Sequence, residues 1–178
     1  MTPPPWVNAA IRSVIWLGGA AGLAYVKKPD GASVLAVRQD AIGWLGGGIF
    51  VAALALHVWS NVRLARGERQ ATARTSPLVT DGPFRYVRNP IYLAGITMLL
   101  GVGLLYPTWE VEDLLLPLFL FAYFHLAVVR IEEPALRQHF GATYEEYCRR
   151  VSRWFPAPAS PSRAAQQRGD TGDASRPG

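Results

Sequence analysis

Two charged segments contain the side chains that are best suited to chemistry. The first, residues 82–92, includes Arg85, Arg88, Asn89 and Tyr92. The Asn-Pro pair in this segment is typical of a helix start. A guanidinium held beside the free N–H groups of a helix start makes a good anion site. We therefore predict that Arg88 binds an anion, whereas Arg85 is expected to contact lipid headgroups.

The second charged segment, residues 130–151, supplies carboxylates. Glu132 and Glu133 are adjacent and must point to different sides of a helix, so a nearby arginine is expected to satisfy only one of them. Acidic groups near a membrane boundary are costly and usually have a partner or a task. Glu146 fits two interpretations equally well, a ligand contact or the acid of a capping box with Thr143.

Four apolar stretches must position these charged segments, and they cover residues 7–26, 41–62, 90–106 and 114–130. A bilayer core needs ~20 apolar helical residues, with a lower limit near 17. Only 17% of the residues are charged, against roughly 25% in an average soluble domain. The sequence predicts an all-α integral membrane protein with about four transmembrane helices. The last two, joined by a short turn, would form a C-terminal helical hairpin.

The ends of the chain differ in composition from the apolar region. The tail at 157–178 is rich in Pro, Ser, Ala, Gly, Gln and Arg. Such a segment buries too little apolar surface to offset the entropy of ordering. We expect a disordered N-terminus at 1–6, one membrane domain at 7–156 and a disordered tail at 157–178.

Between the fourth apolar stretch and the tail, the chain is expected to bend at Pro134 and turn at Gly141. A short amphipathic helix follows, with Tyr144, Tyr147 and Val151 on one face. This spacing predicts a helix that lies on the cytoplasmic membrane surface or folds back over the hairpin.

Other polar residues have structural interpretations. His57 and His125 lie in apolar stretches and are expected to hydrogen-bond between helices, while glycines 46–48 permit close helix contact. Cys148, the single cysteine, cannot form an intrachain disulfide and is interpreted as incidental. Three histidines and one cysteine at these spacings predict no metal site.

The arginine distribution predicts an orientation in the membrane. Loop 63–89 and the segment after 130 are rich in arginine, whereas the turn at 107–113 holds only acidic charges. This is the positive-inside pattern, so loop 63–89 and the C-terminus are predicted to be cytoplasmic in a multi-pass protein of the cell membrane. The net charge of +5 is therefore attributed to orientation in the bilayer, and no nucleic-acid partner is expected.

Residues 82–92 resemble the G-P-[FY]-R-[YF]-x-R-[HN]-P-x-Y signature of the isoprenylcysteine carboxyl methyltransferase family and its phospholipid-methyltransferase-like relatives. The segment 130–156 is similar to the C-terminal signature of the same family. Together the two blocks cover residues 78–156. Asn89 stands where the family often has His, so a proton-transfer role there is not expected. Ser152 replaces the usual proline.

The resemblance implies a membrane enzyme that binds S-adenosylmethionine in a cytoplasmic pocket between the hairpin and the C-terminal segment. The cofactor-binding residues that it implies are Arg88, Asn89, Tyr92, Glu133, Tyr144 and Glu146. The catalytic residues that it implies are Glu133 and Arg150.

The methyl acceptor stays open at the level of sequence. A lipophilic or small molecule reached from the bilayer is expected, with a carboxylate, amine, thiol or hydroxyl as nucleophile. A carboxylate would need no base, whereas an amine or hydroxyl would need one, with Glu133 or Glu146 as candidates. Two alternatives remain: a sterol-reductase-like membrane enzyme with a nicotinamide cofactor, and a non-enzymatic membrane scaffold. The oligomeric state is also open.

Overall fold

The computed structural model describes residues 5–27, 30–31, 36–70, 77–108 and 110–156, so the predicted tail at 157–178 lies outside the described residues. The predicted all-helical class is confirmed. The elements are α1 (Pro5–Lys27), α2 (Ala41–Gln70), the 3-10 turn η1 (Gly82–Arg85), α3 (Pro90–Leu105), the 3-10 turn η2 (Val111–Leu114), α4 (Leu115–Ala127), the π turn η3 (Val128–Glu132), α5 (Glu133–Phe140) and α6 (Ala142–Arg150). No strand occurs among the described residues.

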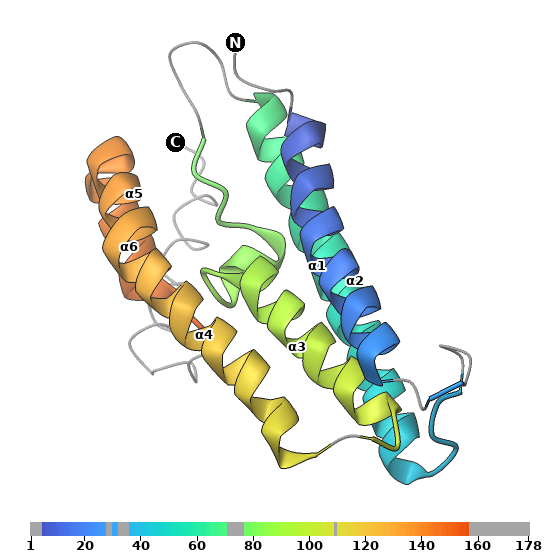
Figure 1. Cartoon of the computed structure of the whole chain (residues 1–178). Helices are drawn as coiled ribbons and strands as arrows, with labels where there is room; N and C mark the ends of the chain where they lie inside the picture. The colour runs from blue at the N-terminus through green and yellow to red at the C-terminus, as the bar shows by residue number, and fades with distance from the viewer. Residues whose placement is uncertain (1–4, 28–29, 32–35, 71–76, 109, 157–178) are drawn as a thin grey trace, which may run out of the picture.

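The first three helices pack against one another, and α4 contacts α3 before leading to α5 and α6 (Figure 1). Within the described residues, two helical segments are long and apolar enough to cross a membrane, Ala41–Gly67 and Leu115–Phe140. A third apolar helix, Pro90–Leu105, is shorter. Much of the surface of α4 is apolar and exposed, including Leu118 and Phe119, as expected of a helix that faces lipid.

Close contact between α2 and α3 depends on glycine. A Cβ atom on Gly101 would lie 2.8 Å from the backbone nitrogen of Phe50 and 2.9 Å from the carbonyl oxygen of Gly46. A Cβ atom on Gly46 would lie 2.8 Å from Leu104. The predicted close contact is therefore confirmed at Gly46, whereas Gly48 has open space around it.

The start of α3 is where the sequence predicts it, at Pro90, but Asn89 does not cap the helix through its side chain. Its Nδ2 instead donates a hydrogen bond to the carbonyl oxygen of Arg153, 3.2 Å away. The reason is that the C-terminal segment passes beside Asn89 and offers an acceptor.

The helix that begins at Leu115 runs on to Phe140, so the expected bend at Pro134 does not end it. Proline lacks the N–H that would close a regular turn. The chain adopts a π turn at 128–132 immediately before it, and such a turn inserts one extra residue into the helix. Glu133, the residue that directly follows this turn, is buried.

The predicted capping box of Thr143 and Glu146 is wrong. The cap of α6 is Gly141, whose φ of +53° is a conformation that favours glycine. This residue alone connects α5 to α6, so Thr143 lies within the first turn of α6. The predicted apolar face is confirmed, because Tyr144, Tyr147 and Val151 form one buried cluster.

Candidate functional site

The C-terminal segment 151–155 lies beside the chain that enters α3. Val87 and Ser152 form an isolated parallel β-bridge. The backbone N–H of Arg88 donates to the carbonyl oxygen of Ser152 at 2.9 Å. These contacts join the two charged segments and bring Arg153 to the start of α5.

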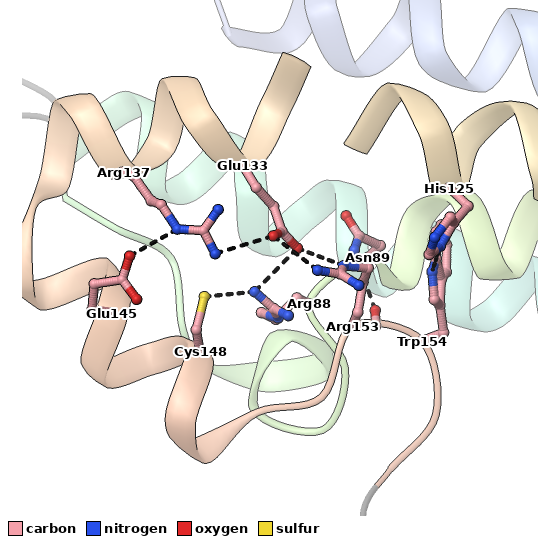
Figure 2. A network of polar contacts seen from close by, with 9 residues as sticks. All are labelled: Arg88, Asn89, His125, Glu133, Arg137, Glu145, Cys148, Arg153 and Trp154. Carbon is pink, nitrogen blue, oxygen red and sulfur yellow. Dashed lines mark hydrogen bonds and ion pairs between the residues drawn. The ribbon is translucent and has the colours of Figure 1, made fainter. Parts of the chain in front are cut away.

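Glu133 is the centre of a cluster of charged side chains (Figure 2). It is only 2% exposed. Arg153 donates to both carboxylate oxygens, from Nε at 2.6 Å and from Nη2 at 3.0 Å. Nη1 of Arg88 lies at 3.2 Å and Nη2 of Arg137 at 3.4 Å. A buried carboxylate needs such partners, and three guanidinium groups favour its ionised form.

Arg88 has an incompletely satisfied guanidinium. Its side chain is 10% exposed, and Nη1 contacts Glu133 and the Sγ atom of Cys148. Its Nε is buried and has no hydrogen-bond partner among the described residues. A buried donor without an acceptor is costly, so the geometry suits an additional acceptor at this point. Arg85, by contrast, is exposed and lies over the ring of Tyr86.

The α6 helix closes one side of this cluster. Tyr144 and Tyr147 are buried, and the Tyr147 hydroxyl donates to the carbonyl oxygen of Phe84 at 2.7 Å. Burial is the main cause that raises the pKa of Tyr144 to about 12, so its phenol is neutral at physiological pH. Cys148, on the same helix, accepts a hydrogen bond from Arg88, so it lies within the cluster.

The two adjacent carboxylates have different partners, as their positions predict. The Tyr92 hydroxyl donates to Glu132, and the Tyr92 ring stacks on Phe124 with 4.5 Å between ring centroids. Tyr92 thus connects α3 to the π turn through Glu132. Glu133, by contrast, contacts arginines.

Glu146 and Arg150 lie apart from the cluster. Glu146 contacts Arg149, and Nε of Arg150 lies 3.4 Å from its Oε1. The hydrogen bond from Arg149, followed by the charges of Arg149 and Arg150, lowers the pKa of Glu146. It is the neighbouring Glu145 that binds Arg137, at 2.8 Å. The predicted roles of Glu146 and Arg150 stay predictions.

Sequence reasoning missed Arg153 and Trp154 as members of the site. Nε1 of Trp154 donates to Nδ1 of His125 at 3.1 Å, which ties the C-terminal segment to α4 (Figure 2). The expected bond from His125 thus goes to a segment outside the helices. His57 does bond between helices, with Ser13 of α1. The only sequence signal for Trp154 is an aromatic residue directly before the polar tail.

Comparisons with known proteins identify relatives of the chain. The model of the phospholipid methyltransferase family matches residues 42–143. The cobalt-zinc-cadmium resistance protein CzcN of Cupriavidus metallidurans is 32% identical over 47% of the chain and 37% of its own length. The nickel-cobalt-cadmium resistance protein NccN of Alcaligenes xylosoxydans xylosoxydans is 29% identical over 47% of the chain and 38% of its own length.

A further relative is the protein-S-isoprenylcysteine O-methyltransferase of Schizosaccharomyces pombe. It is 37% identical over 44% of the chain and 33% of its own length. The matched region thus spans only about a third of the length of each of these curated relatives. No solved structure matches the chain.

Proposed function

The chain belongs to the phospholipid methyltransferase family, and from this membership we propose that it transfers a methyl group from S-adenosylmethionine to a lipophilic acceptor. The relative named as an O-methyltransferase supports methyl transfer. We infer that S-adenosylmethionine is the methyl donor because methyltransferases of this family use it in general. The acceptor reaches the site from the bilayer, because the helices that carry the site expose apolar surfaces.

The observation that carries the proposal is the unsatisfied guanidinium of Arg88. Three arginines contact one buried carboxylate, and Nε of Arg88 lacks an acceptor among the described residues. The carboxylate in the methionine part of the cofactor could accept a hydrogen bond from this guanidinium, and charge-assisted bonds of this kind are strong. Arg88 is thus the proposed anchor of the cofactor.

The other proposed cofactor residues surround this anchor. Asn89 holds the backbone of Arg153. Tyr92 and Tyr144 supply aromatic walls near the two carboxylates. Glu133 orients Arg88 and Arg153 rather than removing a proton, because a carboxylate held by three cations is a weak proton acceptor.

Held by Arg88, S-adenosylmethionine would supply an electrophilic methyl group on a sulfonium sulfur, with a neutral thioether as the leaving group. The task of the protein is then to hold donor and acceptor in line, which can lower the barrier by up to ~7–11 kcal/mol. A carboxylate acceptor requires no general base, and its charge is neutralised as the sulfonium is consumed. A water-poor site at the edge of the bilayer favours such a step.

We place α1, α2, α3 and α4 across the cell membrane, with loop 63–89 and the C-terminus on the cytoplasmic side. The exposed apolar surfaces of α2 and α4 support this placement, as does the arginine distribution. The cofactor is cytoplasmic, so this orientation makes the Arg88 cluster accessible to it.

The direct test is to incubate the purified protein with methyl-labelled S-adenosylmethionine and a membrane lipid extract. Label is expected in an extracted lipid, and a parallel incubation with unlabelled cofactor should raise the mass of the acceptor by ~14 Da, the difference between a methyl group and a hydrogen. The Arg88→Ala variant should transfer much less. Saturable binding of a nicotinamide cofactor without methyl transfer would favour the reductase alternative. Binding of neither cofactor would favour a scaffold.

A further inference from the structure

A second positively charged site lies at the C-terminal end of α2. Here a hollow of about 260 Å³ opens between α2 and the segment 77–81. Its lining includes Arg63, Arg66, Gly67, Val79, Thr80 and Asp81. This volume exceeds that of several water molecules, so the hollow can admit a small polar group. None of these residues belongs to the Arg88–Glu133 cluster.

Among the described residues that line the hollow, the positive charges outnumber the negative ones by one. Arg63 forms an ion pair with Asp81, whose side chain is 60% exposed at the rim. Arg66 makes no ion pair or hydrogen bond with any residue that the structure describes. Positions 63 and 66 are three apart on a helix and therefore project from the same side. Two guanidinium groups and one carboxylate thus surround the opening.

Close packing fixes the shape of the hollow. A Cβ atom on Gly67 would lie 2.2 Å from Cγ2 of Val79, so the segment 77–81 rests directly on the helix backbone. Gly82 has a φ of +58°, and a Cβ atom there would lie 3.0 Å from Cγ of Arg63. Both glycines are needed for the segment to pass this close to α2.

The position of the hollow along α2 points to the surface of the bilayer. Trp59 and Val62 are exposed, at 49% and 41%, on the apolar part of this helix. Tryptophan in such a position is typical of the membrane interface. Arg63 and Arg66 follow Trp59 by roughly 6 and 10 Å along the helix axis. The guanidinium groups therefore lie at the depth of lipid phosphates.

We propose that this hollow binds the phosphate of a membrane lipid, separately from the methyl-transfer site. A phosphodiester carries a single negative charge, which equals the surplus of the hollow. Guanidinium groups bind phosphate oxygens well, and the Thr80 hydroxyl is a further donor in the lining. Asp81 competes with the phosphate for Arg63. The proposal does not depend on the chemistry at Arg88.

The test is to titrate the full-length protein in a non-ionic detergent with phosphatidylglycerol and to count retained lipids by native mass spectrometry. Arg66→Gln is expected to weaken the first binding step about five- to tenfold, or ~1–1.4 kcal/mol. Asp81→Asn is expected to tighten it, because Arg63 is released. Arg130→Gln is the matched control, since Arg130 is likewise basic and exposed but lies outside the hollow.

Three outcomes would overturn the proposal. Equal weakening by Arg66→Gln and Arg130→Gln would mean that the lipid responds to general charge. Equal retention of diacylglycerol of the same chain length would mean that only the acyl chains bind. Inorganic phosphate that displaces the lipid at equal concentration would assign the hollow to a free anion. Circular dichroism of each variant checks that the helices are intact.

Discussion

Nη1 of Arg88 lies 3.2 Å from the carboxylate of Glu133, whose side chain is 2% exposed. This pair joins the loop before α3 to the first residue of α5. Arg153 and Arg137 contact the same carboxylate, so Glu133 keeps two cationic partners when Arg88 is engaged by a ligand. Arg88 is therefore available for binding without leaving Glu133 unpaired.

The first prediction concerns the cofactor anchor. Arg88→Ala should weaken S-adenosylmethionine binding by roughly ten- to a hundredfold, since charge-assisted hydrogen bonds are worth ~1.5–3 kcal/mol. Arg85→Ala should change it much less, because Arg85 is exposed over Tyr86. The measurement is the affinity of each variant for the cofactor in detergent. Equal effects would mean that both arginines serve membrane topology.

The second prediction concerns the buried carboxylate. Glu133→Gln leaves Arg88, Arg137 and Arg153 without their shared anion, and breaking a buried ion pair typically costs ~3–5 kcal/mol. We expect a clear fall in the thermal unfolding midpoint and in cofactor affinity. The matched control is Glu146→Gln, which removes only exposed pairs on α6. Similar unfolding midpoints for the two variants would contradict the assignment of Glu133 as the centre of the cluster.

The third prediction concerns the packing of α2 on α3. A methyl group at Gly101 would meet the backbone of α2, so Gly101→Ala should destabilise the protein by ~1–3 kcal/mol, as overpacking does. Gly48→Ala should be neutral or stabilising, because Gly48 has open space around it and alanine favours helix. The measurement is the thermal unfolding midpoint of each of the two variants in detergent. A stable Gly101→Ala variant would show that the helices are farther apart.

The fourth prediction concerns the C-terminal segment. A chain that ends after Pro158 should bind cofactor normally, because the described contacts of the segment are made by residues before it. A chain that ends after Val151 loses Ser152, Arg153 and Trp154, and with them the contacts to Arg88, Glu133 and His125. It should lose cofactor binding while still inserting into membranes. Loss of binding in the longer chain would place the domain boundary later.

The fifth prediction concerns orientation. Reporter fusions at Arg74 and Ala157 should both indicate the cytoplasm, and a fusion at Glu110 should indicate the opposite side, as the arginine asymmetry requires. A reporter such as alkaline phosphatase, active only outside the cytoplasm, distinguishes the two sides. An external Arg74 would remove the cofactor from reach of Arg88.

Local patterns predicted the parts of the fold that depend on neighbouring residues. The start of α3 at Pro90 and the buried face of α6 are examples, because proline chemistry and helical spacing act over a few residues. The pairing of Arg153 with Glu133 was not predictable, since it requires the chain after α6 to return to Val87. Such contacts depend on tertiary packing, which no short window of sequence records.

The glycine cap of α6 was also missed. Thr143 and Glu146 have the spacing of a capping box, but α6 begins earlier, at Ala142, directly after Gly141 with its positive φ. The spacing of two side chains does not by itself fix where a helix begins.

The β-bridge between Val87 and Ser152 has a consequence for the order of events during synthesis. The four residues of the cluster around Glu133 are made at different times, with Arg88 first, then Glu133 and Arg137, and Arg153 last. A nascent chain can insert its helices as they leave the ribosome, but its charged cluster stays incomplete until Ser152 and Arg153 have been added. A partly translated copy would therefore occupy the membrane without a complete site for the proposed cofactor.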